Sequence, residues 1–550
     1  MFGDLLHLEN DVRSKSAASD YGSGVVRSTG RFYNFSNIRY AAPPIADLRF
    51  APPGHPAVNR TVIQSGQDTR ICPQADGDWE ITAAKFLPQY FNGFRDFNDS
   101  SFPQPNLTFP DQPPDTNEDC LFLDVFVPEH IWERRDSGKK FPVLFWIHGG
   151  GFVFGSKTSY GSPGGLLARS QDYGKPGVIY VSINYRLGAF GWLSGPTFQK
   201  EGGTANAGLY DQRFALEWVQ KHIHLFGGDP DQVTAFGQSG GASSTLHQIT
   251  AYGGTKGSVP FIRAITQSPG FQVNVCPRQQ QITFQNFLQA ANVIPLAQAR
   301  ALPYWRIQKA NLLTIAKSPY GTYTYGPVVD GIFTPSTPGE LLAHGQYDQN
   351  VKVMTGQTQN EGFLFTPPYL ANDSDDSRLR NFVTTNVPTL KELPHQLDYL
   401  INTLYPPTFD GSQPQGYQDR IARGAAIIAE FALICNNFYL NKAHDNKTFG
   451  YLFDVFPALH GSDATYTYST SGGRANTSTG AVQVALEMQD YITSFAETGD
   501  PNQPGVPFFK MYGDNASVHV LELNGVRDTL DPAANKRCDW WQSGRWYKEY

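Results

Sequence analysis

The sequence predicts an α/β protein with a large, mostly parallel central sheet flanked by helices. Continuous apolar runs of strand length alternate with long amphipathic segments, and this alternation is typical of a parallel sheet covered on both faces. The chain has 550 residues, of which 40% are hydrophobic and 17% charged, so it can bury a large core. Long stretches between the regular segments predict helical and loop-rich insertions that cap the sheet.

The expected elements can be placed in order along the chain. Turn-punctuated, strand-like segments come first, followed by a Pro-rich passage at 42–56. Strands are then expected at 121–128, 142–147, 177–183 and 232–236, with one helix at 206–226 and another from Ala242. No internal repeat and no linker long enough to separate domains is evident, so we expect a single catalytic domain over residues 1–550.

Charge and cysteine usage narrow the class of protein. The formal net charge is −7, and no basic run is present, which argues against nucleic acid as a partner. No uninterrupted apolar stretch of about 18 residues is present, so no transmembrane segment is expected. The five cysteines lack the CxxC or Cys/His spacing of a metal site.

Two features bear on where the protein acts. Eight Asn-x-Ser/Thr sequons indicate glycosylation and secretion; they begin at Asn34, Asn59, Asn98, Asn106, Asn372, Asn446, Asn476 and Asn515. The first residues, from Met1 to His7, lack the apolar region of a signal peptide. Either a leader has been removed or the protein stays inside the cell, and we favour a secreted, extracellular protein.

The pentapeptide Gly237-Gln238-Ser239-Gly240-Gly241 fits the G-x-S-x-G pattern. In this pattern a sharp strand-to-helix turn raises the serine oxygen above the sheet, at a helix N-terminus. With 53 glycines in the chain, a plain glycine-rich turn is the alternative. An expected strand before the turn and a helix after it favour Ser239 as a nucleophile.

A glycine run directly follows the apolar strand that ends at Ile147. His148-Gly149-Gly150-Gly151 can present successive backbone N–H groups to a cleft without side chains in the way. Such donors stabilise a tetrahedral oxyanion, each contributing on the order of 3 kcal/mol. A phosphate loop is excluded because no GK[ST] follows, and a flexible loop is the remaining alternative. We predict that Gly150, Gly151 and Gly240 form an oxyanion hole.

Further segments along nearly the whole chain carry a family resemblance: IRYAAPP at 38–44, LRF at 48–50, EDCL at 118–121, NYRLG at 184–188, GLYDQ at 208–212, FGGDP at 226–230 and TQS at 266–268. With the serine turn and the glycine loop, the chain resembles the type-B carboxylesterase/lipase family, which includes cholinesterases and fungal lipases. Within the family, its sequence pattern most resembles that of fungal secreted esterases and lipases. The resemblance implies an α/β-hydrolase fold and a carboxylic-ester hydrolase.

The resemblance also implies particular site residues. It points to a Ser-Glu-His triad, with the acid at Glu361 in Asn360-Glu361-Gly362 and the base at His460 in a His-Gly pair. In such a triad a general base takes the serine proton and a carboxylate orients its imidazole. Ser268 becomes a candidate partner of Glu361, an ordinary turn serine being the alternative.

The same resemblance implies disulfides between Cys72 and Cys120 and between Cys435 and Cys538. Cys276 is left without an obvious partner, and we expect it to be a free buried thiol.

Some residues depart from the family pattern. Many relatives have Glu before the nucleophile and Ala after it, whereas Gln238 and Gly240 stand here. After His460 the sequence runs Ser-Asp-Ala, unlike the Tyr-Glu of cholinesterases. The segment between Cys72 and Cys120 also lacks the tryptophan context of a choline site, and we interpret Trp79 as a packing residue. Choline esters are therefore not favoured substrates.

Three classes of function are compatible with these residues. The first is hydrolysis of a small-molecule or lipid-like ester through an acyl-enzyme on Ser239. The second is acyl transfer or lactone formation, in which an alcohol replaces water on the same triad. The third is a catalytically inactive binding protein, against which the intact candidate triad argues. The chemistry needs no metal and no organic cofactor, and the sequence gives no oligomeric state.

The segment 72–120 is long and aromatic. In lipase relatives the corresponding disulfide loop acts as a lid, so this segment is a candidate lid that favours an apolar or bulky acyl or alcohol group. The alternative is a glycosylated surface excursion, since two of the sequons lie within it.

Overall fold

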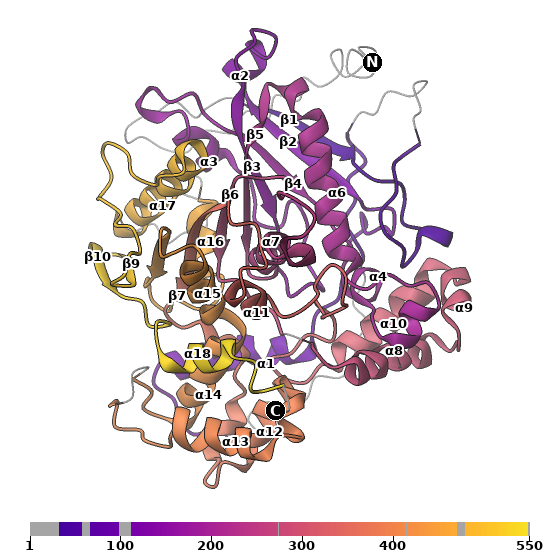
Figure 1. Ribbon diagram of the computed structural model, residues 1–550, viewed down its shortest axis with the longest axis vertical. Helices are drawn as coiled ribbons and strands as arrows, with labels where there is room; N and C mark the ends of the chain where they lie inside the picture. The colour runs from indigo at the N-terminus through magenta and orange to yellow at the C-terminus, as the bar shows by residue number, and fades with distance from the viewer. Residues whose placement is uncertain are drawn as a thin grey trace.

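The fold is organised around one sheet that uses strands from both ends of the chain. A computed structural model describes residues 32–57, 66–97, 112–272, 274–412, 416–469 and 479–547. Within these residues the sheet has ten strands in the order β1-β2-β4-β3-β5-β6-β7-β8-β9-β10 (Figure 1). The strands are β1 (Phe32–Arg39), β2 (Phe122–Pro128), β3 (Phe141–Ile147), β4 (Ile179–Ile183), β5 (Gly228–Gln238), β6 (Arg263–Gln267), β7 (Lys352–Thr358), β8 (Phe449–Phe453), β9 (Ser517–Glu522) and β10 (Gly525–Leu530).

The sheet is parallel in its centre and antiparallel at its edges. From β4 to β9 every neighbouring pair is parallel. β1, β2 and β4 pair antiparallel at one edge, and β9 and β10 do so at the other. The carboxyl ends of the central strands therefore meet at one edge of the sheet, where α/β proteins hold their sites.

Helices cover both faces of the sheet. Those of the described chain are α1 (Asp78–Phe91), α2 (Glu129–Glu133), α3 (Gly164–Arg169), α4 (Gly188–Trp192), α5 (Pro196–Lys200), α6 (Ala207–His222), α7 (Gly240–Ile249), α8 (Pro277–Ala291), α9 (Leu296–Ala301), α10 (Tyr304–Ala316), α11 (Pro338–Ala343), α12 (Ser377–Asn386), α13 (Pro394–Tyr399), α14 (Arg420–Ala429), α15 (Cys435–Ala443), α16 (Ser462–Thr467), α17 (Thr479–Thr498) and α18 (Lys536–Gln542). In Figure 1 helices α8, α9 and α10 project together beyond one end of the sheet.

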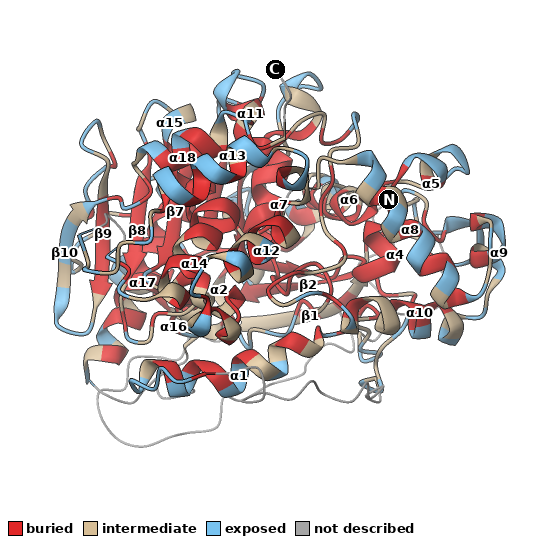
Figure 2. Ribbon diagram, turned by 90° about the horizontal axis from the view of Figure 1, so that it is seen from below, coloured by how far each residue is buried: buried red, intermediate tan, exposed pale blue. Residues whose placement is uncertain are grey.

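Alternate side chains of β3 pack into two different clusters of buried residues. Val143 and Phe145 pack into the cluster that contains residues of α6, whereas Leu144 and Trp146 pack into the cluster that contains residues of α17. All four are buried, because successive side chains of the strand point to opposite faces and both faces are covered. Figure 2 shows the buried strands in the middle of the molecule, with exposed residues on the outer sides of the helices.

The expected elements are present, with shifted ends. The strands predicted at 121–128, 142–147, 177–183 and 232–236 correspond to β2, β3, β4 and β5, and β5 extends further at both ends. The predicted helix at 206–226 is α6 followed by a short 3₁₀ turn, Ile223–Phe226. The prediction of a helix from Ala242 was late, since α7 starts at Gly240, directly after Ser239.

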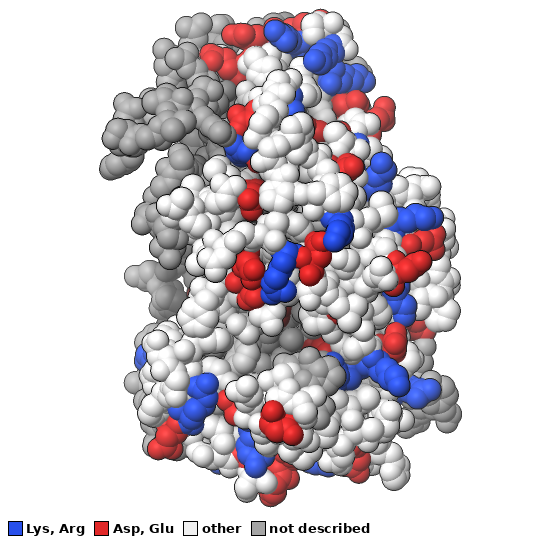
Figure 3. Space-filling view, turned by 90° about the vertical axis from the view of Figure 1, so that its left-hand side faces the viewer, with Lys and Arg blue, Asp and Glu red and all other residues white. Residues whose placement is uncertain are grey.

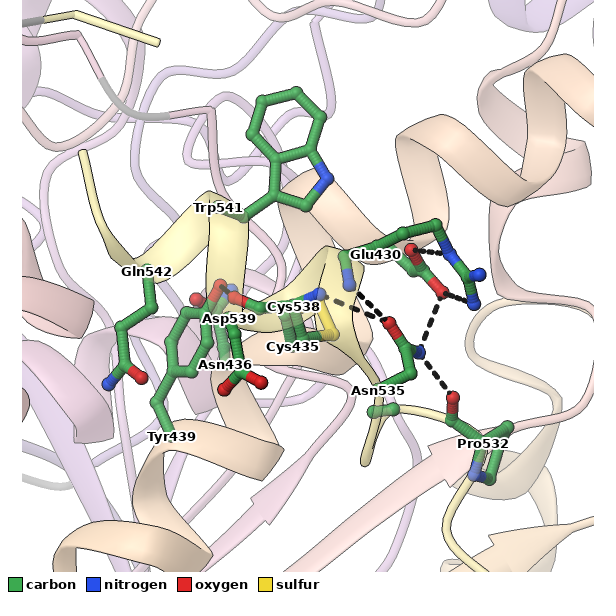
Figure 4. The surroundings of a disulfide bond; sticks show 12 residues. Glu430, Cys435, Asn436, Tyr439, Pro532, Asn535, Cys538, Asp539, Trp541 and Gln542 are labelled. Carbon is green, nitrogen blue, oxygen red and sulfur yellow. Dashed lines mark hydrogen bonds and ion pairs between the residues drawn. A yellow bond between two sulfur atoms is a disulfide. The ribbon is translucent and has the colours of Figure 1, made fainter. Parts of the chain in front are cut away.

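Both predicted disulfides are present. Cys72 pairs with Cys120 and Cys435 with Cys538, with Cα–Cα separations of 5.0 and 5.3 Å. The second ties α15 to α18, beside the buried pair of Glu430 and Arg537 (Figure 4). Cys276 is free, but it is half-buried rather than buried as expected.

Charge on the surface is mixed in sign. On the face drawn in Figure 3, Lys and Arg lie among Asp and Glu over the described residues. One helical stretch among the described residues, 420–443, has the length and apolar composition of a membrane span. Its apolar window is 83% buried inside the molecule, as expected for a core helix.

Candidate active site

Ser239 lies on a sharp turn between β5 and α7. Its φ of 54° and ψ of −123° are unusual for a residue with a side chain. A Cβ on Gly237 would lie 2.3 Å from the backbone of Gly241, and one on Gly241 would lie 1.9 Å from the carbonyl oxygen of Ile147. Glycine is therefore required on both sides of the serine because the turn brings backbone segments into contact.

The side chains of Ser239, His460 and Glu361 form a continuous hydrogen-bonded chain. His460 Nε2 lies 2.8 Å from Ser239 Oγ, and His460 Nδ1 lies 2.5 Å from Glu361 Oε2. Glu361 is 1% exposed, and the His460 side chain 6%. The three residues that the sequence predicted as nucleophile, base and acid are thus brought together.

Glu361 is held from two further directions. Its Oε1 accepts hydrogen bonds from the backbone N–H of Thr358, at 2.7 Å, and from the hydroxyl of Ser268, at 2.5 Å. Ser268 follows β6 and has a φ of 54°, so a second tight turn aims its hydroxyl at the carboxylate. Ser268, which the resemblance made a candidate partner of Glu361, is thus hydrogen-bonded to it in the structure.

Backbone pairing fixes His460 beside Glu361. The N–H of Asn360 donates to the carbonyl of Ala458, and its side-chain amide donates to the carbonyl of Pro457. These bonds join the segment after β7 to the segment after β8. The acid and the base therefore share one local frame, although they are 99 residues apart in the sequence.

The glycine loop after β3 lies next to the serine turn. Gly150 and Gly151 have φ values of 105° and 57°. A Cβ on Gly150 would lie 2.1 Å from the carbonyl oxygen of Phe154, and one on Gly151 would lie 2.5 Å from the ring of Tyr323. Their N–H groups bond to no backbone carbonyl of the described chain, and Gly240 begins α7, where N–H groups have no partner within the helix.

His148 is a structural residue of this loop. Its ring stacks on Tyr185 with 4.4 Å between centroids, and its Nδ1 lies 2.8 Å from the carbonyl oxygen of Gly149. Burial lowers the pKa of His148 to about 4, so the imidazole is neutral at physiological pH. A neutral, fully packed imidazole holds the loop in shape without carrying charge.

Three buried residues behind the site, Asp463, Tyr451 and Gln267, were not predicted as site residues. Asp463 Oδ2 accepts a hydrogen bond from the hydroxyl of Tyr451 at 2.7 Å, and that hydroxyl accepts one from Gln267 Nε2 at 2.8 Å. Burial, followed by the negative charge of Glu361, raises the pKa of Asp463 to about 6. The only sequence signal for Asp463 was its position in the Ser-Asp-Ala segment after His460.

A cavity of about 680 Å³ opens over Ser239. Around the serine it is lined by apolar and glycine residues, including Gly151, Phe152 and Leu433. Helices α8 and α10 and the loop at 319–328 line much of the rest. The site can therefore admit a small organic ester and bring its carbonyl between Ser239 and the glycine N–H groups.

The segment 72–120 packs against this cavity through α1. The indole Nε1–H of Trp79 donates to the carbonyl of Thr322, which lines the cavity, and the ring lies 6.1 Å from that of Phe365. Phe365 in turn lies 5.2 Å from the His460 ring. The interpretation of Trp79 as a packing residue agrees with these contacts, and 98–111 of the candidate lid lie outside the described residues.

Four of the eight predicted sequons begin within the described residues and four outside them. Asn59, Asn98, Asn106 and Asn476 lie outside the described residues. Asn372 and Asn515 are exposed, whereas Asn34 and Asn446 are half-buried. Glycosylation of any of them stays a prediction.

The parallel sheet, the strained serine turn and the adjoining glycine loop define an α/β-hydrolase. The sequence matches the carboxylesterase family over residues 22–541. The chain therefore belongs to the carboxylesterase family, and it is a carboxylic-ester hydrolase.

Curated relatives and solved structures agree with this assignment. The chain is 39% identical to carboxylesterase patB of Penicillium expansum, over 94% of this chain and 92% of that protein. It is 31% identical to lipase 1 of Geotrichum candidum, over 92% and 91% of the two chains. The crystal structure of Aspergillus niger EstA covers 95% of this chain and 96% of its own, with a TM-score of 0.75 and 25% identity.

Proposed function

We propose that the protein hydrolyses carboxylic esters through an acyl-enzyme on Ser239, with a Ser239–His460–Glu361 triad. The observation that carries the proposal is the unbroken chain of hydrogen bonds from Ser239 Oγ through His460 to Glu361. His460 Nε2 takes the serine proton as Oγ attacks the ester carbonyl, and Glu361 holds the imidazole in the required tautomer.

The glycine N–H groups stabilise the oxyanion of both tetrahedral intermediates. Gly150, Gly151 and Gly240 supply them next to the serine. His460 then returns its proton to the departing alcohol, and the acyl group stays on Ser239. A water molecule, deprotonated by the same imidazole, releases the acid and regenerates the serine.

The test compares Ser239→Ala with Ser194→Ala, a serine in the wall of the same cavity. We expect Ser239→Ala to lower kcat at least about 10⁴-fold and to abolish labelling by a fluorophosphonate, because the nucleophile is gone. Ser194→Ala keeps both the labelling and most of the activity. Unchanged turnover in a folded Ser239→Ala protein would refute the proposal.

Acyl transfer is the second candidate on the same residues. The relatives of this chain described above are a carboxylesterase and a lipase, so hydrolysis is favoured. Adding a competing alcohol to the assay separates the two reactions. A free acid as the dominant product supports hydrolysis, and a new ester or lactone as the dominant product supports transfer.

We also propose that the protein acts outside the cell. Two disulfides are typical of proteins from oxidising compartments. Relatives at 30% identity include secreted lipase 1 of Botryotinia fuckeliana. Detection of the active enzyme in culture medium, with glycans on the sequons, is the expected result.

A further inference from the structure

The cavity over Ser239 changes character along its length. Beside the serine its wall is made by groups such as Phe152, Trp192 and Leu433. The rings of Phe152 and Trp192 pack at a tilt, with 4.6 Å between centroids, and both are nearly fully buried. This part can hold the ester carbonyl and a short apolar chain, but it offers little to a polar group.

Another part of the wall is polar and belongs mainly to α8. From α8, Gln279, Thr283, Asn286 and Gln289 line the cavity. Their spacing of three to four residues places them along one face of the helix. Each is exposed or half-buried, so this part of the cavity is its mouth.

These α8 side chains have unused hydrogen-bonding capacity. The described structure assigns no hydrogen-bond partner to any of the four side chains. By contrast, Gln272 deeper in the wall donates to the carbonyl of Gly321 at 3.0 Å and to Asn386, and its Oε1 accepts from the N–H of Tyr323. Gln272 is therefore structural, whereas the α8 face is available to a ligand.

Lys317 brings a positive charge to this mouth. It follows α10, is exposed, and lines the cavity. No Asp or Glu is among the described residues that line the cavity, and Lys317 makes no ion pair with a described residue. An ammonium beside uncharged amides is a suitable environment for a carboxylate, whereas the protein as a whole carries a formal charge of −7.

We propose that Lys317 and the polar face of α8 form a substrate subsite for a carboxylate-bearing arm of the ester. The substrate class is an ester whose reacting carbonyl sits in the apolar part and whose charged end reaches the mouth. The amides of Gln279, Asn286 and Gln289, spaced along α8, offer hydrogen bonds to polar groups at different points along the arm. This inference rests on the proposed attack by Ser239 and specifies what that site accepts.

The experiment uses two matched pairs of esters. In the first pair the acyl side differs: mono-para-nitrophenyl glutarate against its neutral methyl ester. In the second the alcohol side differs: the butanoate of meta-hydroxybenzoic acid against that of its methyl ester. The enzyme variants are Lys317→Gln and, as a matched control, Lys140→Gln. Lys140 is exposed and immediately precedes β3, at the end of the sheet opposite Ser239.

The expected result is selective for charge. Lys317→Gln raises KM for the charged member of at least one pair by about fivefold, with kcat and the neutral member unchanged. The effect shrinks at high ionic strength because salt screens the ammonium. Lys140→Gln changes neither member.

The proposal is overturned if Lys317→Gln leaves both pairs unchanged, or affects charged and neutral members equally. Loss of the subsite is distinguishable from failure of the proposed function. The first leaves Ser239-dependent hydrolysis of the neutral esters intact, whereas the second appears as hydrolysis that survives in Ser239→Ala.

Discussion

Asp463 lies behind the candidate triad, completely buried, with one carboxylate oxygen bonded to Tyr451. Neither Tyr451 nor Gln267, which completes this network, touches the cavity. The carboxyl of Asp463 is close enough to Glu361 and His460 for their charges to influence its pKa. At the scale of single residues, the protonation of the Asp463 carboxyl therefore depends on the charges of Glu361 and His460.

The first prediction concerns stability and pH at Asp463. Its pKa is raised from 3.8 to about 6 in the folded protein, so the folded state keeps a proton that the unfolded chain releases. Stability from this group is complete below about pH 4 and is lost as the pH rises to about 6. Asp463→Asn has no such proton, and we expect its free energy of unfolding to fall less over this window, by up to about 3 kcal/mol.

Urea unfolding at pH 4.5 and pH 7 measures this difference. Equal pH dependence in the two proteins would show that Asp463 does not titrate in this range. Asp124→Asn is the comparison, because Asp124 too is buried but is paired with Lys157.

At the scale of elements, α1 is the link between the candidate lid and the site. Trp79 bonds to the loop that lines the cavity, and Tyr90 and Phe91 both pack on Phe363, two residues beyond Glu361. Helix α1 thus covers the segment that carries the acid. This arrangement is compatible with a lid and also with a fixed wall.

The second prediction separates these possibilities. Trp79→Ala removes a buried indole and its hydrogen bond, with an expected cost of about 3–5 kcal/mol to the packing of α1. If α1 covers the entrance as part of a lid, the chain-length preference over a panel of para-nitrophenyl esters shifts toward bulkier acyl groups. Trp305→Ala is the control, since Trp305 is 64% exposed.

An unchanged preference in Trp79→Ala, together with faster proteolysis between Cys72 and Cys120, would identify α1 as a fixed wall. The same panel with the loop shortened gives an independent reading. No change there removes the lid hypothesis.

At the scale of the whole molecule, the C-terminal helix is held by covalent and polar contacts. Cys538 of α18 joins Cys435, 103 residues earlier, and Arg537 beside it pairs with the buried carboxylate of Glu430 (Figure 4). Asn535 caps α18 by accepting from the N–H groups of Arg537 and Cys538. These contacts join the end of the chain to α15, which packs on β7 and so on the strand that leads to Glu361.

The third prediction tests this connection. The double variant Cys435→Ala with Cys538→Ala removes the covalent link, so the unfolded chain gains conformational entropy. We expect a loss of about 4 kcal/mol in the free energy of unfolding. Cys276→Ser, which alters the free thiol, is the control and leaves stability nearly unchanged. Denaturant unfolding of both variants decides the matter. A double variant as stable as the parent protein would contradict the prediction.

The local parts of this protein were predictable from the sequence because each is set by short-range geometry. The apolar runs of β3 and β4 follow from burial on both faces, and the glycines around Ser239 follow from a turn that leaves no room for a Cβ. The glycine loop after Ile147 and the two cysteine pairs follow from motif and resemblance. The turn and the glycine loop require no knowledge of a distant residue, whereas the cysteine pairs, 48 and 103 residues apart, came only from the resemblance.

Only the tertiary structure decided the contacts between distant segments. His460 is 221 residues from Ser239, and only the family resemblance singled it out among the 12 histidines. The pKa of Asp463, the packing of α1 and the polar mouth formed by α8 and α10 depend on which segments the sheet brings together. The sequence by itself determined the tight turn at Ser239 and the glycine loop beside it, because both depend on local backbone geometry, whereas the walls of the cavity over Ser239 were decided by long-range packing.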